Sequence, residues 1–401
     1  MRTLPLWFGP AERRLFGWMH QPEGGRARGA VVLCPPFGLE GVNAHHTYRR
    51  LATQLAAEGL AVLRFDYDGT GDSVGHHGDP NRPEAWLASI RSAVELVRCA
   101  GATQVAMVGM RMGATLAAAA AARWPLDALV LWDACPSGRS FVRQQKAMWG
   151  VLVDQAPEGV ALGAGSAVET PGLPWEAGDP PDLSDLDLAR LDGPLAARLL
   201  VLSRPGRPPG AWLAPTLASA SLCPEEVAGQ PELLDCPSLL AAVPEAAVAT
   251  VSAWLSRTLD AAPAAFSVSP GGSAVVGRDP LGRRIVERPL RLGPNGLFAM
   301  ATELERGGAE STVLLVNTGL EHHIGPMRLW VDLARGWAAS GVRTVRFDVS
   351  GVGDSPVRPG QAEHVVHAPE WLDDAADAVA AVSGGDPSEV MVVGHCAGGY
   401  L

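Results

Sequence analysis

Cys396 is the side chain of this sequence with the clearest potential for nucleophilic chemistry. It lies in the segment GHCAG (394–398), directly after the apolar run 390–393, which is typical of a strand. The pattern G-x-C-x-G is typical of a sharp turn between a strand and a helix, where small residues let the backbone pass close to the nucleophile. The helix that follows would direct its partial positive charge at the thiol and favour a thiolate. The spacing therefore predicts attack by Cys396 on a carbonyl carbon.

An attacked carbonyl needs hydrogen-bond donors for its oxygen. The backbone N–H of Ala397 is one candidate, because the residue after the nucleophile faces the oxyanion in such turns. The other candidates follow Asn317 in an upstream loop: Thr318, Gly319 and Leu320. His395 is adjacent to Cys396 and cannot easily fold back onto it, so we do not expect it to be the base. A buried structural cysteine in a glycine-rich turn is the alternative interpretation.

A turn of the same form occurs earlier in the chain without the chemistry. We call 109–113 the first elbow and 394–398 the second elbow. The first elbow, GMRMG, places Arg111 at the nucleophile position, and arginine stays protonated and cannot attack a carbonyl. No histidine occurs between positions 78 and 321, and no carboxylate directly follows the predicted strand 198–203. We therefore predict a degenerate, non-catalytic site formed by Arg111, Met112 and Phe37.

The two elbows belong to a repeat. The block GLAVLRFDYDGTGDS (59–73) matches GVRTVRFDVSGVGDS (341–355) at a spacing of 282 residues. Further along, the segment 105–113 matches 390–398 in the same order. A repeat of this length indicates duplicated domains rather than a solenoid.

Within each copy, apolar runs alternate with helical patterns. The first copy has predicted strands at 30–34, 60–65 and 104–108, and predicted helices at 48–58 and 84–100. Strands that alternate with helices imply a mostly parallel sheet with helices on both faces. The sequence therefore predicts a duplicated α/β fold.

The string CPPFGLE…LRFDYDGTGDS…GMRMGATLA…LVLWDACPSGRSF covers most of residues 28–145. It resembles the exosortase-A-associated hydrolases and their serine-aminopeptidase-like relatives in the α/β-hydrolase superfamily. An arginine often occupies the elbow in that group, so the resemblance makes Arg111 a family trait. Residues 310–401 resemble a tandem hydrolase unit with a cysteine elbow. The resemblance implies an α/β-hydrolase fold and a small-molecule substrate with an ester, thioester or amide bond.

The repeat divides the chain into a first unit (1–259), a linker (260–284) and a second unit (285–401). An insertion at about 136–195 interrupts the first unit. Its amphipathic start, 141–153, fits a lid helix over the site, and a disordered insertion is the alternative.

The chain stops five residues after Cys396, whereas a hydrolase of this order places its acid and histidine after later strands. We therefore expect the second unit to be the N-terminal half of a hydrolase domain, and the chain to be a fragment with little or no turnover.

Aspartates follow the predicted strand 60–65 and its counterpart in the second copy. Turn and capping roles fit their positions better than a metal site: Asp66, Asp68, Asp72, Asp348 and Asp354. The segment 69–71 lacks the third glycine of a dinucleotide fingerprint, so NAD binding is not expected. Because the aspartates fit turn roles, no metal is expected either, and we predict no cofactor. Adjacent histidines diverge and make poor metal clamps, so we favour packing over a site role for His322 and His323.

Composition excludes several classes of protein. The net charge of −11 argues against a nucleic-acid binder. The six cysteines are widely spaced, without CxxC pairs, so a reducing, cytoplasmic location is the simplest expectation. Charges interrupt the apolar N-terminus, and no apolar run is long enough to span a membrane. The sequence does not predict an oligomeric state.

Two functions stay open. In the first, the full-length protein is a hydrolase or acyltransferase in which Cys396 attacks an acyl bond. In the second, the first unit is a pseudo-hydrolase that binds an acyl or anionic ligand, with Arg111 as its contact.

Overall fold

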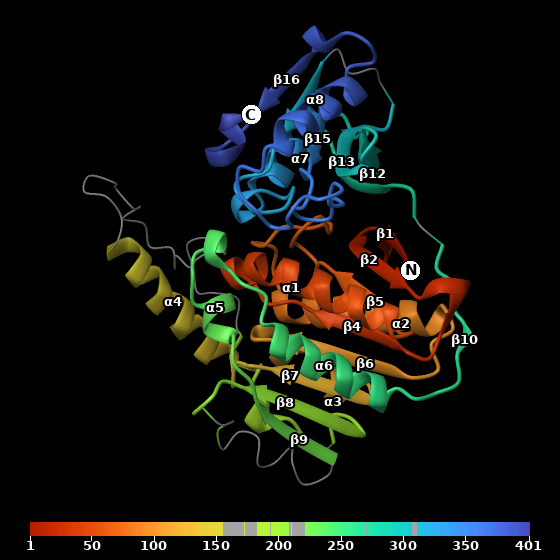
Figure 1. Ribbon diagram of the computed structural model, residues 1–401, viewed down its shortest axis with the longest axis vertical. Helices are drawn as coiled ribbons and strands as arrows, with labels where there is room; N and C mark the ends of the chain where they lie inside the picture. The colour runs from red at the N-terminus through yellow and green to blue at the C-terminus, as the bar shows by residue number, and fades with distance from the viewer. Residues whose placement is uncertain are drawn as a thin grey trace.

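The computed structural model describes residues 1–154, 172, 183–192, 194–207, 210, 221–269, 271–306 and 311–401. In these residues the chain forms an eight-stranded sheet and a six-stranded sheet, which lie in two parts of the molecule (Figure 1). A small ladder joins β3 (Arg26–Ala27) to β10 (Ala264–Ala265).

The larger sheet belongs to the first unit. Its strands, in spatial order, are β1 (Arg2–Phe8), β2 (Leu15–Gln21), β5 (Ala61–Phe65), β4 (Ala30–Cys34), β6 (Val105–Met110), β7 (Ala128–Trp132), β8 (Arg198–Ser203) and β9 (Ser221–Glu226). β1, β2 and β5 pair antiparallel, and every pair from β5 to β9 is parallel. β4, β6 and β7 are buried along their whole length, as parallel strands covered on both faces must be.

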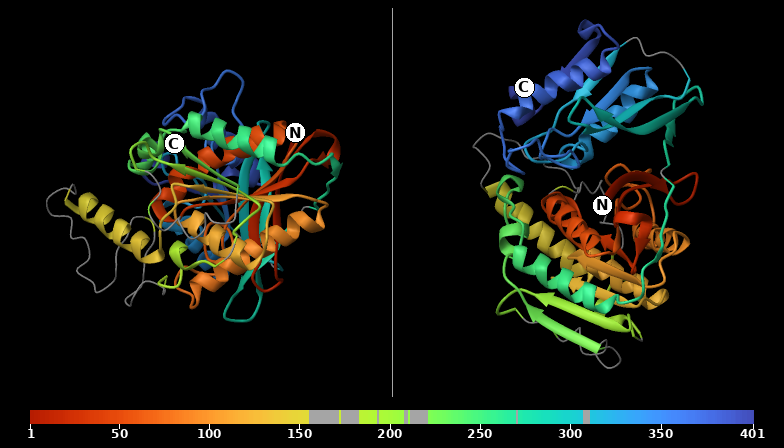
Figure 2. Two further views of the ribbon diagram at one scale, coloured as in Figure 1. Left: turned by 90° about the horizontal axis from the view of Figure 1, so that it is seen from below. Right: turned by 45° about the vertical axis from the view of Figure 1, so that its right-hand side comes forward.

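Helices cover both faces of this sheet (Figure 2). α1 (Gly38–Ala57) and α6 (Glu245–Thr258) pack on one face, and α2 (Arg82–Cys99) and α3 (Met112–Arg123) pack on the other. α4 (Gly138–Asp154) and the short α5 (Gln230–Leu234) complete the unit. The predicted α/β fold with a mostly parallel sheet is therefore confirmed here.

The second sheet has the order β11 (Ala274–Arg278), β12 (Arg284–Leu292), β13 (Leu297–Leu304), β15 (Arg343–Phe347), β14 (Thr312–Leu315) and β16 (Val390–Val393). α7 (Leu329–Ala339) and α8 (Glu370–Val382) flank it. Single turns of 3-10 helix occur at Glu23–Gly25, Leu188–Arg190, Ser238–Leu240, Pro326–Arg328, Pro387–Glu389 and Cys396–Tyr400. From β12 to β16 the strand order repeats that of β1 to β6 in the first unit.

The structure differs from the sequence predictions in several places. The helix predicted at 48–58 begins ten residues earlier, as α1 (Gly38–Ala57). The second sheet is mixed rather than mostly parallel, because β11, β12, β13 and β15 pair antiparallel. β11 lies within the expected linker and pairs with β12, so below we count 274–401 as the second unit. The helix expected at 141–153 is α4, but most of the remaining insertion, 155–171 and 173–182, lies outside the described residues.

Candidate functional site

The second elbow has the strand and the tight turn that its sequence predicted, but a 3-10 turn takes the place of the expected α-helix in residues 396–400. Cys396 follows β16 and opens a 3-10 turn with φ of 55°, a strained conformation for a residue with a side chain. A Cβ atom on Gly394 would collide with the carbonyl of Gly398, and one on Gly398 would collide with the carbonyl of Asn317. The turn therefore requires glycine at both positions, and it lies against the loop that carries the oxyanion candidates.

The Cys396 side chain is exposed to solvent. Cys396 is a free cysteine, and within the described residues no hydrogen bond joins its Sγ to a potential base. The adjacent His395 is also exposed. The thiol is accessible to a substrate, but among the residues that the structure describes no side chain is in place to take its proton.

Asn317 holds the candidate oxyanion loop in place. Its Nδ2 donates to the carbonyl of Glu321 at 2.8 Å and to Oδ1 of Asp348 at 2.9 Å, and its Oδ1 accepts from the backbone N–H of Val349 at 2.7 Å. The predicted oxyanion candidates lie near Asn317. The buried hydroxyl of Thr318 has no partner among the described residues, and Gly319 has a φ of 58°. Leu320 and Ala397 are buried. The loop and the elbow are thus brought together as expected.

The first elbow has the same turn with a different side chain. Arg111 lies between β6 and α3 with φ of 54°, and Met112 is fully buried at the start of α3. A Cβ atom on Gly113 would collide with the carbonyls of Cys34 and Pro35. Both elbows therefore have the same positive φ at the nucleophile position and the same close approach of a glycine to a neighbouring loop.

The Arg111 guanidinium is enclosed by acceptors, and the residue is 8% exposed. Its Nε donates to Oε1 of Glu40 at 3.0 Å, and its terminal nitrogens donate to the carbonyl of Asp133 at 3.1 Å and to Oε1 of Gln144 at 2.5 Å. Burial raises the pKa of Glu40, and the charge of Arg111 opposes that shift. Arg111 is thus part of an ion-pair cluster.

The ion-pair cluster extends to Arg204 and Asp235, which lie where an active hydrolase of this order would carry its acid and its base. Arg204 directly follows β8; its Nε donates to Oδ2 of Asp133 at 2.8 Å, and its terminal nitrogen pairs with Asp235. The sequence showed that an acid and a base are missing here, but it did not lead us to predict that acidic and basic side chains alternate through this cluster. The available signal was that Asp133 and Arg204 directly follow adjacent parallel strands, whose carboxyl ends meet at one sheet edge.

Equivalent residues of the two units exchange ion pairs across their interface. Arg346 of the second unit pairs with Asp72 of the first at 2.6 Å, and Arg64 of the first pairs with Asp354 of the second at 2.5 Å. Each arginine and each aspartate is 282 positions from its counterpart. The interface therefore has the self-complementary pattern of a twofold axis, in which each unit offers the same groups to the other.

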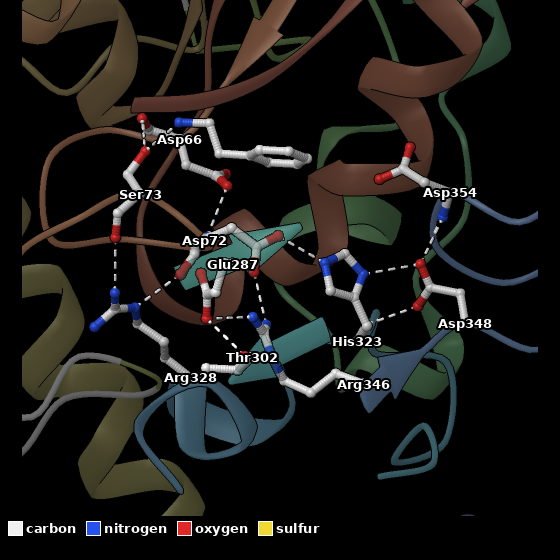
Figure 3. A network of polar contacts seen from close by, with 12 residues as sticks. Asp66, Asp72, Ser73, Glu287, Thr302, His323, Arg328, Arg346, Asp348 and Asp354 are labelled. Atoms are coloured by element: carbon white, nitrogen blue, oxygen red, sulfur yellow. Dashed lines mark hydrogen bonds and ion pairs between the residues drawn. The ribbon is translucent and has the colours of Figure 1, made fainter. Parts of the chain in front are cut away.

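His323 lies at the centre of the buried network in Figure 3. Its Nδ1 is 2.9 Å from Oδ2 of Asp348 and its Nε2 is 2.7 Å from Oδ2 of Asp72. Burial alone lowers the pKa of His323, but the two carboxylates outweigh it and raise the pKa to about 10. Glu287, also buried, accepts from Arg346 at 2.8 Å and Arg335 at 2.7 Å. Because both ring nitrogens face carboxylates, His323 is an imidazolium that joins the two units.

The aspartates after β5 and β15 have the predicted turn role. The backbone N–H of Asp72 donates to Asp66 at 3.0 Å, and that of Asp354 donates to Asp348 at 2.9 Å. Asp72 and Asp354 have an additional role, the interface, which the sequence interpretation did not include. In the described ranges, no group of three or more His, Cys, Asp or Glu side chains is arranged so that it could hold a metal ion. No helix in the same ranges has the length and apolar character needed to cross a membrane.

Comparisons with known proteins agree with the fold of the first unit. Residues 25–151 match the family described as serine aminopeptidase, S33. The match spans β4 to α4 and includes the first elbow, but it covers less than half of the chain. The curated proteins contain no match to this sequence.

Solved structures with a similar fold include three hydrolases. The proline iminopeptidase of Mycobacterium smegmatis is 16% identical, with a TM-score of 0.42, over 64% of this chain and 98% of that one. An α/β serine hydrolase without a lid from Xanthomonas campestris is 18% identical, with a TM-score of 0.41, over 66% and 98%. An esterase domain from Rhodothermus marinus is 18% identical, with a TM-score of 0.41, over 64% and 98%.

Proposed function

We propose that this chain is a duplicated α/β-hydrolase-type protein whose two elbows have different roles. Cys396 is the nucleophile for an ester, thioester or amide bond, and the first elbow is non-catalytic. One observation carries the proposal: the two elbows share a strained turn, at φ 54° and 55°, but one presents an exposed thiol and the other an arginine held in ion pairs.

In the proposed reaction, the Cys396 thiolate forms a bond to the carbonyl carbon, and the carbonyl electron pair moves to oxygen. The backbone N–H of Ala397 and donors of the loop 317–320 stabilise that oxyanion. The tetrahedral intermediate then expels the alcohol, thiol or amine, which takes up a proton and leaves an acyl-cysteine. Water releases the acid and restores the thiol. Because no base contacts Cys396 among the described residues, we expect acylation without rapid turnover.

The test uses p-nitrophenyl acetate with the full chain. The wild type is expected to release up to about one equivalent of nitrophenolate, because a thiol at the elbow is acylated and deacylates slowly. Cys396→Ala is expected to lower the acylation rate by about tenfold or more, since its oxyanion donors have no nucleophile to assist. Cys99→Ala is the matched control, because Cys99 is also exposed but lies at the end of α2. Mass spectrometry of the labelled peptide identifies the modified residue.

Equal acylation of Cys396→Ala and wild type contradicts the nucleophile assignment. Equal losses in the Cys396 and Cys99 variants point to nonspecific thiol reactivity and contradict it as well.

A binding role for the first unit is the second candidate. A cavity of about 500 Å³ lies beside Arg111 and Arg204. Oε2 of Glu40 and the side-chain amide of Gln145, both buried residues that line it, have no partner among the described residues. Unsatisfied buried polar groups are costly, and a ligand that reaches them would remove that cost. As this second candidate, the cavity would bind an acyl or anionic ligand beside Arg111 and Arg204.

Acetate is a suitable probe for this second candidate. Sodium acetate is expected to raise the melting temperature of the wild type in a saturable way, since it would bind only the folded state. The effect is expected to disappear in Arg111→Met, which keeps the side-chain bulk but removes the charge. Arg123→Met is the control, because Arg123 pairs with Glu84 on the surface. An identical acetate effect in all three proteins excludes Arg111 as the contact.

A further inference from the structure

A second cavity lies between the two units. Its described lining residues belong to neither elbow, although Pro35, against which the first elbow packs, forms part of its wall. The cavity has a volume of about 160 Å³. Its walls are mostly apolar and come from both units: Phe16, Trp18, Phe37 and Tyr67 from the first, and Ile324 and Met327 from the second. Phe37, which the sequence assigned to the degenerate elbow, stacks on Tyr67 with ring centroids 4.9 Å apart. The reciprocal ion pairs of Arg64 and Arg346 hold these walls together.

Two polar side chains face this cavity without a hydrogen-bond partner in the described parts of the chain. Asp66 uses Oδ2 to accept the backbone N–H of Asp72, and its Oδ1 is left without a donor. His322 stacks on His45 with ring centroids 4.2 Å apart, but its ring nitrogens make no hydrogen bond. The other charged or titratable groups that line the cavity have partners of their own: Arg64, Asp354, Asp72, His323, His45, His77 and Arg328.

In the second unit, hydrogen-bond donors surround the carboxylate that corresponds to Asp66. Asp348, the counterpart of Asp66, accepts hydrogen bonds from Asn317 and from the side chain and backbone of His323. In the first unit, the position equivalent to Asn317 is Pro35, which carries no side-chain donor. The Asp66 carboxyl therefore faces open space where its counterpart meets an amide.

Both groups are uncharged under mildly acidic conditions. Burial, followed by the charge of Asp72, raises the pKa of Asp66 to about 7. Burial, followed by the neighbouring His45 and His323, lowers the pKa of His322 well below its ordinary value of 6.5. Near pH 6 the cavity thus presents a neutral carboxylic acid and a neutral imidazole, each able to donate and to accept one hydrogen bond.

We propose that the cavity between the units binds a compact, uncharged molecule of about one aromatic ring that carries a hydroxyl or amide group. The volume fits, since an apolar cavity of about 150 Å³ accommodates benzene. The aromatic walls favour a flat ring, and the two free polar groups select a hydrogen-bonding substituent. Charged analogues are disfavoured, because a charge would lose its hydration without gaining a free counter-charge. The proposal does not depend on the chemistry of Cys396.

The test is a calorimetric titration of phenol into the full chain at pH 6. We expect saturable binding to the wild type and its loss in Val42→Trp, because Val42 lines the cavity from α1 and an indole would fill the space. Val365→Trp is the matched control, since Val365 is exposed and does not line the cavity. Circular dichroism and the melting temperature of each variant check that it folds.

A second variant separates the hydrogen bond from the cavity volume. His322→Phe keeps a ring stacked on His45 but removes the polar atoms, so phenol is expected to bind about threefold to tenfold more weakly. Benzoate is expected to bind more weakly than phenol to the wild type. Undetectable binding of phenol to the wild type, unchanged binding to folded Val42→Trp, or benzoate binding as tight as phenol binding would each overturn the proposal.

Discussion

Replacement of His323 by glutamine is expected to destabilise the protein by about 3–5 kcal/mol, the usual cost of removing one member of a buried ion pair. His323 is 2% exposed and connects Asp72 of the first unit to Asp348 of the second. A glutamine carries no charge and cannot donate to both carboxylates from one planar amide in the same geometry. The two aspartates would then share a buried region with less positive charge.

Urea unfolding, followed by circular dichroism and tryptophan fluorescence, measures the change. His395→Gln is the control, because His395 is exposed and its replacement is expected to shift stability by no more than about 0.5 kcal/mol. A loss below about 1 kcal/mol in His323→Gln would show that the imidazolium does not hold the interface together.

The same variant has a defined pH dependence. The pKa of His323 is raised from 6.5 to about 10 in the folded protein, so its stabilising contribution is fully present below pH 6.5. The contribution then falls as the pH rises through 10. The stability difference between wild type and His323→Gln is therefore expected to be largest near pH 6 and smallest near pH 10. A difference that does not change with pH contradicts a charged His323.

The repeat made much of the fold predictable. Runs such as 30–34 and 199–202 are apolar throughout; the first forms the buried strand β4, and the second forms the buried centre of β8. The glycines of both elbows predicted turns in which the backbone passes close to itself, and the collisions at Gly113 and Gly398 show why. These features are local, because a few neighbouring residues determine them.

The packing of one unit on the other was not predictable in the same way. The sequence predicted turn roles for Asp72 and Asp354, and their local hydrogen bonds are indeed those of a turn. Their ion pairs with Arg346 and Arg64 depend on the placement of two domains, which a repeat spacing does not specify. A charged residue that recurs within an apolar strand of both copies was the available signal, since a buried arginine needs a partner.

Replacement of Asp66 by asparagine is expected to stabilise the protein at pH 8, which is unusual for a half-buried polar residue. The folded pKa of about 7 lies above the ordinary value of 3.8, so folding favours the protonated acid. The cost of ionising Asp66 is absent below pH 3.8, grows as the pH rises to 7 and is constant above it. About three pKa units correspond to up to about 4 kcal/mol. Asparagine cannot ionise, and its carbonyl oxygen can still accept the backbone N–H of Asp72.

Asp348→Asn is the matched control, because it makes the same change at the equivalent position of the second unit. Asp348 faces the charged His323, so its neutralisation is expected to destabilise the protein. The two variants should therefore move the urea midpoint in opposite directions at pH 8, and the gain from Asp66→Asn should shrink towards pH 5. If the stability of Asp66→Asn relative to wild type does not rise between pH 5 and pH 8, Asp66 does not carry a raised pKa. In that case the cavity between the units would present a carboxylate, and its preference for uncharged ligands would lose its physical basis.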